Sequence, residues 1–408
     1  MNLLLFSTLY PNANQPHHGI FVENRLRQLL AYTGWRAHVV APVPYFPNIG
    51  WRPRAYAPFI DMPRREQRHG VSVEHPRFAV IPKIGMSVTP ALLYLSARRT
   101  VAQLMRQGHR FDLIDAHYVF PDGVAAGLLA REFKLPYTIT GRGTDLNLIP
   151  RFAVPRRQIQ WTAKRADALI TVCDALAEDL ADLGIARQRV TVLRNGVDLT
   201  AFRRDEAARA ALRQTWSADN QPVYLSVGHL IDRKGHDLVI EALVGLPGHL
   251  VIAGTGPEES ALRRLAARLG VAERVHFLGA LPHEQLYQVY SAADLLILAS
   301  SREGWPNVLL ESLACGTPVV ATAVNGSPEV VREAVAGEVV EDRTAAALCA
   351  AAGRVLARRA DPAAVRAYAE AYSWDATSQG QQQLFTAIVG QRRPDQRSSR
   401  GTDPLGHP

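Results

Sequence analysis

The sequence predicts an α/β protein built from two doubly wound, Rossmann-like domains that face each other across a cleft. Short β-rich runs alternate with amphipathic helical patterns along most of the chain, which is typical of parallel sheets covered by helices on both faces. The alternation is interrupted once, near the middle, and then starts again. With 408 residues, the chain is long enough for two such domains, each with its own core.

The first domain is predicted over residues 1–196. Its opening run, "NLLLFST", lacks a basic leader segment and a small-residue cleavage site, so it fits a buried strand better than a signal peptide. Amphipathic helices such as "FVENRLRQLLAYTG" and "DGVAAGLLAREF" lie between the strands. The further predicted strands are "HVVAPV", "LIDAHY", "YTITGR", "ALITVC" and "VTVLRNG".

The second domain is predicted over residues 197–372. The boundary is placed at the turn dipeptide Asn195-Gly196, because the segment that follows is polar and has no strand pattern. Since open α/β sheets bind ligands beyond the carboxyl ends of their strands, two facing sheets imply a shared site. The predicted strands of this domain are "PVYLSVG", "HLVIAGTG", "VHFLGAL", "LLILAS" and "PVVAT".

The end of the chain is predicted to leave both sheets. Residues 373–391 have a helical pattern with a candidate N-cap at Ser373 or Asp375. Residues 392–408 are polar and rich in Pro and Gly, so a disordered tail is expected there.

The composition is that of a soluble protein in a reducing compartment. Apolar residues make up 47% of the chain and charged residues 21%, which excludes global disorder. Three scattered cysteines, Cys173, Cys315 and Cys349, are too few for a disulfide framework or a CxxC metal site. No run of 18 apolar residues occurs. We therefore expect a cytoplasmic protein, or one that lies on the inner face of the cytoplasmic membrane without crossing it.

Positive charge is concentrated in the first half. Residues 1–200 contain 25 Lys and Arg against 15 Asp and Glu, whereas the remainder contains 21 against 23. Residues 51–110 alone contain 11 basic and 3 acidic side chains, but they lack the motifs of nucleic-acid-binding modules, so no nucleic-acid partner is predicted. A basic amphipathic pattern over "TPALLYLSARRTVAQLMRQGHR" fits contact with anionic lipid. A helix that packs on its own domain with a solvated basic face would show the same pattern.

The loop after "VYLSVG" is a candidate phosphate site. Gly228 allows a sharp turn at the strand end, and His229 follows it. Arg233 and Lys234 then place cations that suit phosphate oxygens. A solvated loop with two surface cations would explain the same residues.

A second candidate lies in "SREGWPNVLLESLACGTPVVAT". Pro306 suits the first turn of a helix, whose amides would form an anion-binding end. Glu311, one turn further on, suits a neighbouring diol such as ribose, and Glu303 suits hydroxyls on the other side of the phosphates. Two carboxylates that accept hydrogen bonds from hydroxyls, on either side of one anion site, match the chemical groups of a nucleoside diphosphate sugar. The amides in question belong to Asn307, Val308 and Leu309.

These motifs resemble a known family. "SVGHLIDRKGHDLVIEAL", "AGTGPEESAL" and "VHFLGALPHEQLYQVYSAADLLILASSREGWPNVLLESLACGTPVVAT" resemble, in order and spacing, the C-terminal domain of retaining family-4 glycosyltransferases of the GT-B fold. "PNANQPHHGIFVENRLRQL", "DAHYVFPDG" and "TGRGTDLN" look like the subgroup of teichuronic acid and exopolysaccharide biosynthesis. The resemblance covers about residues 1–390, and in this fold the last helix crosses back to the first domain.

The resemblance implies a role for each matching residue of the second domain. Glu311 would bind the ribose and Glu303 the hydroxyls of the donor sugar, while Lys234 and Arg233 would hold the diphosphate as catalytic cations. The backbone after Gly279 would meet the base. The family usually has Arg where this chain has His229, so the second cation of the usual grip would come either from Arg233 or from a protonated His229.

In the first domain the resemblance points to four residues. Gly19, in the loop "STLYPNANQPHHGIF", would lie against the donor phosphates, and His117 would contact a hydroxyl of the transferred sugar as a catalytic residue. Arg142 and Asp145 are assigned to the acceptor side of the cleft only, because the family often has His-Gly where this chain has Arg142-Gly143. Three of them also have a structural alternative: a plain strand-to-helix loop for Gly19, a structural strand-end histidine for His117 and a turn aspartate for Asp145.

The predicted function is retaining transfer of a sugar from a UDP or GDP sugar to a glycan or polyprenyl-linked acceptor in cell-surface polysaccharide biosynthesis. The chain has no DxD motif, so no metal ion or other cofactor is expected. The resemblance implies front-side attack, with the leaving phosphate taking the acceptor's proton. Two alternatives remain: a nucleotide-sugar 2-epimerase, and a catalytically silent scaffold that binds nucleotide sugars.

Overall fold

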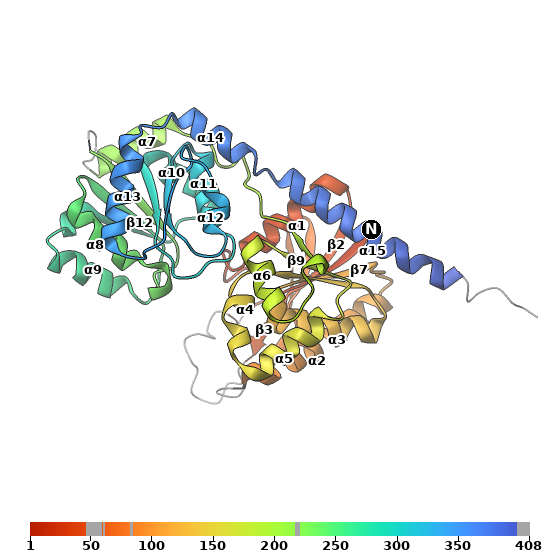
Figure 1. The fold of residues 1–408 in the computed structure, drawn as a ribbon. Coiled ribbons are helices and arrows are strands. Elements are labelled where there is room, and N and C mark those ends of the chain that lie inside the picture. Colours follow the sequence, from red (N-terminus) through yellow and green to blue (C-terminus); the bar gives the residue numbers. More distant parts are fainter. Residues whose placement is uncertain (46–58, 60–61, 82–84, 217–220, 398–408) are drawn as a thin grey trace, which may run out of the picture. The chain divides into compact units, whose positions relative to one another are not determined.

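The computed structural model describes residues 1–45, 59, 62–81, 85–216 and 221–397. The chain forms two units (Figure 1). The first comprises Met1–Thr171, Ala177–Leu193 and the described residues from Asp375 onward, and the second comprises Val172–Leu176 and Arg194–Trp374. The chain thus passes to the second unit at Arg194, three residues before the predicted boundary, and Val172–Leu176 is a short excursion that the sequence does not predict.

An eight-stranded sheet forms the centre of the first unit, in the order β10-β9-β8-β7-β1-β2-β5-β4. All neighbours are parallel except β4 and β5. The topological switch point lies between β1 and β7, where the order reverses. A parallel pair, β3 (Val43–Tyr45) and β6 (Arg77–Ala79), lies apart from this sheet. The strands of the main sheet are β1 (Asn2–Phe6), β2 (Arg36–Val40), β4 (Arg65–Arg68), β5 (Val71–Glu74), β7 (Leu113–His117), β8 (Tyr137–Gly141), β9 (Ala168–Thr171) and β10 (Val190–Val192).

Helices cover both faces of this sheet (Figure 1). α1 (Ile20–Thr33) and α15 (Trp374–Arg397) pack on one face, where Leu29 and Phe385 are buried against Leu3. α2 (Gly85–Arg106), α3 (Val124–Phe133) and α5 (Ala153–Ala163) pack together on the other. The remaining helices are α4 (Thr144–Asn147) and α6 (Asp174–Asp182).

The final helix belongs to the first unit from its second residue onward. Phe385, Ile388 and Val389 are its buried side chains in the core that also contains Leu3 and Leu113. The helix continues to Arg397, six residues past the predicted end at 391. Residues 392–397 are therefore helical and not the start of a disordered tail, and residues 398–408 lie outside the described residues.

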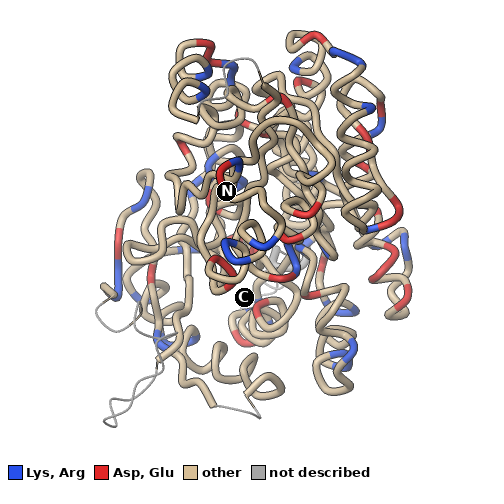
Figure 2. The backbone as a smooth tube through the Cα atoms, turned by 90° about the vertical axis from the view of Figure 1, so that its left-hand side faces the viewer, with Lys and Arg blue, Asp and Glu red and all other residues tan. Residues whose placement is uncertain are grey.

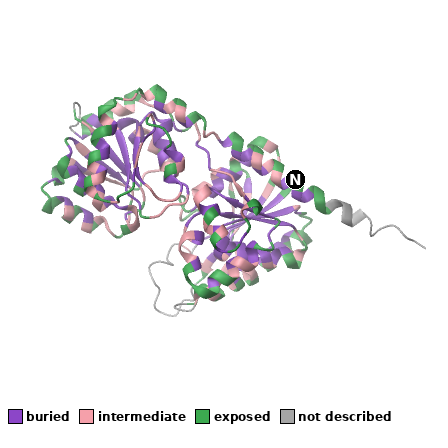
Figure 3. Cartoon of the chain, viewed as in Figure 1, coloured by how far each residue is buried: buried purple, intermediate pink, exposed green. Residues whose placement is uncertain are grey.

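A six-stranded, fully parallel sheet forms the centre of the second unit, in the order β13-β12-β11-β14-β15-β16. This is the doubly wound order with its switch point between β11 and β14. Three inner strands of this order, β11, β14 and β15, are buried at every residue because helices cover both faces of the sheet, and Figure 3 shows the centre of the sheet as buried. The strands of the sheet are β11 (Val223–Val227), β12 (His249–Ala253), β13 (Val275–Gly279), β14 (Leu295–Leu298), β15 (Val319–Thr322) and β16 (Gly337–Val340).

The helices of the second unit also cover both faces of its sheet (Figure 1). One face carries the core formed with α8 (His236–Ala242), α9 (Glu259–Arg268) and α13 (Ala345–Ala357). The other carries α10 (Leu286–Ala292) and α11 (Asn307–Ala314), with α7 against α10 and α14 against α11. The bounds of the rest are α7 (Glu206–Thr215), α12 (Ser327–Val330) and α14 (Pro362–Glu370).

None of the helices within the described ranges combines the length and the apolar character that a membrane span requires. The basic helix predicted near residue 90 is α2. Its side chains Leu93, Val101 and Leu104 are buried in the first unit, so these apolar side chains belong to the core and are not available for lipid. Leu95 and Met105 remain exposed. Part of the basic stretch 51–110 lies outside the described residues.

Candidate functional site

A buried ion pair stands at the switch point of the second unit. The chain leaves β11 through Gly228 and reaches Lys234 in a 3₁₀ turn, and it leaves the neighbouring β14 through Ser300 to reach Glu303. Lys234 Nζ lies 2.6 Å from Glu303 Oε1, and Ser300 donates a hydrogen bond to the same oxygen. The strand order thus joins two residues that are 69 positions apart in the sequence.

The carboxylate of Glu303 is kept ionised by these partners. Burial alone would raise the pKa of Glu303, but the Lys234 ammonium and the Ser300 hydroxyl hold it below its ordinary value. Arg233 lies further away, with Nη1 at 3.7 Å from Glu303 Oε1, and donates to the carbonyl of Arg302. The predicted cations and the predicted sugar-binding carboxylate therefore form one cluster.

Glycine is required at one position of this loop for reasons of packing. At Gly235, φ is +68° and a Cβ would stand 2.2 Å from the carbonyl oxygen of Ala299. At Gly228 the space is open, since a Cβ would first meet the Lys234 side chain at 3.5 Å. Gly228 nevertheless has φ +149°, and its carbonyl lies against Gly254. His229, which follows it, is exposed.

The predicted helix that contains Glu311 is α11, which begins at Asn307, so Pro306 caps the helix and does not lie in its first turn. The expectation that the first three amides are free is wrong for Leu309, because its N–H donates to the carbonyl of Pro306 at 3.0 Å. The side-chain oxygen of Asn307 accepts from Asn195. Of the three predicted amides, those of Asn307 and Val308 therefore remain candidates for binding an anion.

Glu311 has two partners that the sequence analysis missed. His283 Nε2 lies 3.0 Å from Oε1, and the Tyr290 hydroxyl donates to Oε2 at 2.8 Å. The ring of Phe202 packs edge-on against both aromatic partners. The sequence gives only a weak indication of these partners, which is the spacing of His283 and Tyr290. They lie seven positions apart, a spacing that places residues on one side of a helix.

The Glu311 cluster is electrostatically coupled. Burial alone would lower the pKa of His283, but Glu311 reverses this and raises it. Burial and the same carboxylate hold the pKa of Tyr290 well above its ordinary value. Tyr290 is therefore a fixed hydrogen-bond donor, and His283 carries positive charge over a wider pH range than an isolated histidine. Each carboxylate oxygen can accept a further hydrogen bond.

Gly279, predicted near the base, ends β13 with φ +69°. Its carbonyl accepts from the amide of Gly254, and nothing lies within 4 Å of the position of a Cβ. The backbone is therefore open on that side.

The first unit has a polar cluster at its own switch point. Ser7, directly after β1, donates to the carbonyl of His117 at the end of β7. The amide and hydroxyl of Thr8 both donate to the carboxylate of Asp122. Asp122 is completely buried, which raises its pKa to about 7. Asp122 thus fixes the loop that leads to Gly19.

Both ring nitrogens of His117 are engaged within this unit. Arg142 Nη2 donates to Nδ1 at 2.5 Å, and Nε2 lies 3.2 Å from Asp115 Oδ2. Burial lowers the pKa of His117 to about 4, with the Arg142 charge also contributing, so the ring is neutral and donates from Nε2. Asp115 also accepts from Thr138. The resemblance places Arg142 on the acceptor side only, and the contact of Arg142 with His117 is not predicted from the sequence.

Two further predicted residues of this unit have clear structural roles. Asp145 is buried and accepts hydrogen bonds from the amides of Val119, Arg142 and Gly143, as expected for a turn aspartate. Gly19 has φ +68°, and a Cβ there would lie 2.4 Å from the backbone of Leu9. The fold therefore explains Gly19 without a ligand, and its predicted contact with phosphate stays a prediction.

Within the described part of the chain, no group of three or more His, Cys, Asp or Glu side chains is arranged to hold a metal ion. The three cysteines, all of which the structure describes, form no disulfide bond.

Comparison with known proteins assigns the family. Residues 25–201 match the model of Glycosyltransferase Family 4, and residues 209–372 match that of Glycosyl transferases group 1. D-inositol 3-phosphate glycosyltransferase of Geodermatophilus obscurus is 33% identical over 350 residues, which cover 79% of this chain and 77% of that protein. The chain belongs to the family-4 glycosyltransferases.

Further relatives agree with this assignment. The putative teichuronic acid biosynthesis glycosyltransferase TuaC of Bacillus subtilis is 28% identical over 333 residues, covering 80% of this chain and 82% of TuaC. The crystal structure of Anabaena HepE in complex with UDP matches with a TM-score of 0.73 and 21% identity, covering 95% of this chain and 99% of HepE. WaaG, a glycosyltransferase of lipopolysaccharide biosynthesis, matches with a TM-score of 0.64 and 19% identity, covering 96% of this chain and all of WaaG. The predicted family and the predicted GT-B fold are confirmed.

Proposed function

We propose that this glycosyltransferase moves a sugar, with retention of anomeric configuration, from a nucleoside diphosphate sugar to a glycan or lipid-linked glycan in cell-surface polysaccharide biosynthesis. The observation that carries the proposal is the buried Lys234–Glu303 pair at the switch point of the second sheet. A cation beside a hydroxyl-accepting carboxylate fits a ligand that joins a diphosphate to a sugar.

The donor roles follow from this cluster. Lys234 and Arg233 would bind the diphosphate and stabilise the negative charge that develops on it as the glycosidic bond breaks. Glu303 would accept hydrogen bonds from sugar hydroxyls, and Glu311, held by His283 and Tyr290, would accept them from ribose. No metal ion is needed for this distribution of charge. The assignment of His117 to the transferred sugar rests on the family resemblance alone, and it requires a ring nitrogen to exchange its contact with Arg142 or Asp115 for the sugar hydroxyl.

Uracil is the base that we favour for the donor nucleotide, with guanine second. HepE, which has this fold, has been crystallised with UDP, with UDP and glucose, and with UDP-glucose. The open backbone at Gly279 suits recognition of the base by main-chain groups.

The acceptor is proposed from the relatives. TuaC is named for teichuronic acid biosynthesis and WaaG for lipopolysaccharide biosynthesis. A lipid-linked acceptor would require the enzyme to approach a membrane, for which α2 offers exposed Leu95 and Arg99. Arg98 is less available, since it pairs with Glu132. Co-sedimentation with anionic vesicles at low salt tests this part, and absence of binding would refute it.

The test of the reaction is incubation of the protein with UDP-glucose and GDP-mannose, with and without a glycan acceptor. The proposal predicts acceptor-dependent release of nucleoside diphosphate and a product whose anomeric configuration, read by NMR, equals that of the donor. An epimerised nucleotide sugar formed without acceptor would establish the epimerase alternative. Binding without any turnover across a panel of acceptors would favour the scaffold.

A further inference from the structure

A cavity lies at the ends of the strands of the second sheet opposite to those that lead to Lys234 and Glu303. Its volume is about 490 Å³, and its wall includes Pro222, Asp294 and Pro318. These residues directly precede β11, β14 and β15, so the cavity is at the amino ends of the strands. The candidate donor site is at their carboxyl ends. The two sites are thus separated by the length of the strands.

Arginine dominates the charge of this cavity. Among the residues that the structure describes, four arginines line it, against one carboxylate, Asp294. They come from three segments: the stretch before α7, the helix α7 itself and the turn after α13. Figure 2 marks the basic and acidic residues along the backbone. The arginines are Arg204, Arg209, Arg213 and Arg359.

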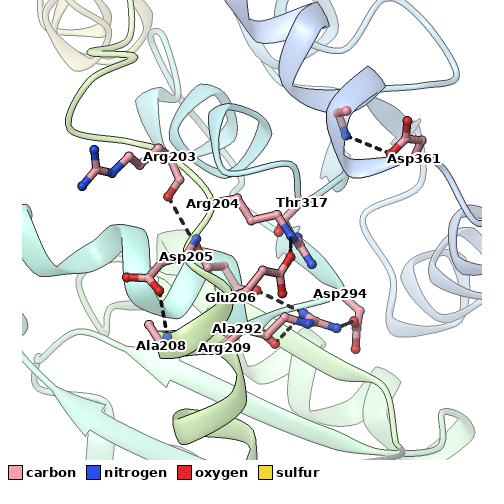
Figure 4. A network of polar contacts seen from close by, with 12 residues as sticks. Arg203, Arg204, Asp205, Glu206, Ala208, Arg209, Ala292, Asp294, Thr317 and Asp361 are labelled. Carbon is pink, nitrogen blue, oxygen red and sulfur yellow. Dashed lines mark hydrogen bonds and ion pairs between the residues drawn. The ribbon is translucent and has the colours of Figure 1, made fainter.

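The fold accounts for two of these arginines, and Figure 4 shows the contacts of one of them, Arg209, with Ala292 and Asp294. Arg209 donates to the carbonyls of Ser291, Ala292 and Ala293 at the end of α10, and it pairs with Asp294. Arg213 donates to Ala292, and it also pairs with Asp294. Both guanidinium groups therefore cap the carboxyl end of α10, where cations stabilise a helix. Asp294 is shared between them, so its single negative charge is already neutralised by these two arginines.

The fold does not account for Arg204 and Arg359 in this way. Arg204 pairs with Glu206, whose side chain is 70% exposed, so this pair adds little to stability. The Arg359 side chain is exposed, and among the described residues it makes no ion pair or side-chain hydrogen bond. Arg204, paired with a largely exposed glutamate, and the exposed Arg359 therefore border a cavity whose other described charged residues, Arg209, Arg213 and Asp294, already give a net positive charge.

We propose that this cavity binds a small anion that carries phosphate groups, independently of the donor site. The guanidinium fork matches phosphate oxygens in a bidentate manner, and charge-assisted bonds of this kind are strong. The volume falls within the range of sites for small molecules. Arg204 and Arg359 are the residues that close on the ligand, and Arg209 and Arg213 supply the fixed positive field.

The experiment is isothermal titration calorimetry of the full chain with sodium pyrophosphate. Since pyrophosphate also mimics the donor diphosphate, three variants are compared with the natural protein. Arg204→Gln/Arg359→Gln alters the cavity, and Lys234→Met/Glu303→Gln alters the donor site. Arg358→Gln is the matched control, because Arg358 neighbours Arg359 but pairs with Glu338 and does not line the cavity.

The proposal predicts two binding events in the natural protein and in Arg358→Gln. Arg204→Gln/Arg359→Gln should weaken one of them at least tenfold and leave the other, whereas Lys234→Met/Glu303→Gln should do the reverse. Unchanged binding in Arg204→Gln/Arg359→Gln would overturn the proposal. So would complete loss of pyrophosphate binding in Lys234→Met/Glu303→Gln, since all binding would then belong to the donor site. Thermal unfolding of each variant confirms that it is folded.

Discussion

Replacing Lys234 with methionine tests the buried pair at the switch point. Methionine keeps most of the side-chain volume but removes the ammonium that lies 2.6 Å from Glu303. The side chains of Lys234 and Glu303 are 15% and 10% exposed, so solvent replaces the lost partner poorly. Removing one partner of a buried pair costs about 3–5 kcal/mol. We expect a loss of about 3 kcal/mol, at the lower end of that range, because Ser300 and Arg233 remain near the carboxylate.

The assay is urea unfolding at pH 7.5, monitored through a signal that reports on the second unit. For a unit of this size, about 3 kcal/mol corresponds to a fall in Tm on the order of 10 °C. The double variant Lys234→Met/Glu303→Gln removes the charge that is left behind. It should therefore regain most of the lost stability, to within about 1 kcal/mol of the natural protein.

The pH dependence gives a separate check. In the natural protein the lowered pKa of Glu303 contributes stability above the ordinary pKa of a glutamate, and this stability is lost as the pH falls through the lowered value. In Lys234→Met burial prevails and raises that pKa, so the variant should become more stable on acidification from pH 7.5 to 5. Equal destabilisation at both pH values, with no recovery in the double variant, would refute the reasoning.

Three further variants test other parts of the structure. Asp122→Asn should flatten the pH dependence of the stability of the first unit. Because the pKa of Asp122 is raised to about 7, the stability that its protonated form contributes falls as the pH rises from about 4 to 7, by up to about 4 kcal/mol. An unchanged slope of stability against pH in the variant would contradict the burial of Asp122. His283→Gln should remove a contribution that is fully present below the ordinary histidine pKa and lost as the pH rises through the raised value; an identical stability profile between pH 6 and 9 would contradict the pairing with Glu311. Phe385→Ala, which empties a fully buried position on α15, should cost the first unit about 3–5 kcal/mol in urea unfolding, and a loss below 1 kcal/mol would show that this helix is not part of its core.

The central strands and the Lys234–Glu303 site follow from local sequence. A parallel strand covered on both faces is a continuous apolar run, so strands such as Leu295–Leu298 are visible without tertiary information. The residues of a doubly wound site follow those strands directly, which is why Glu303 and Lys234 could be predicted. The short edge strand Arg65–Arg68 is polar throughout and antiparallel, so its pattern is that of a loop.

The partners of the site residues could not be predicted, because they depend on tertiary packing. His283 meets Glu311 only after α10 and α11 pack together, and 28 residues separate them in the sequence. Arg142 meets His117 across two neighbouring strands. The Leu309 amide was expected to be free from the general rule for helix ends, but a local turn at Pro306 uses it.

The most direct test of the donor site is thermal unfolding with UDP, GDP, ADP and dTDP, measured on the natural protein and on Glu311→Gln. A ligand at 100 times its Kd stabilises the folded state by about 2.7 kcal/mol. The proposed site predicts that UDP, or failing that GDP, gives a selective rise in Tm, and that Glu311→Gln loses most of this rise while staying folded. No shift with any nucleotide, or an equal shift in both proteins, would contradict the assignment of Glu311 and of the donor site.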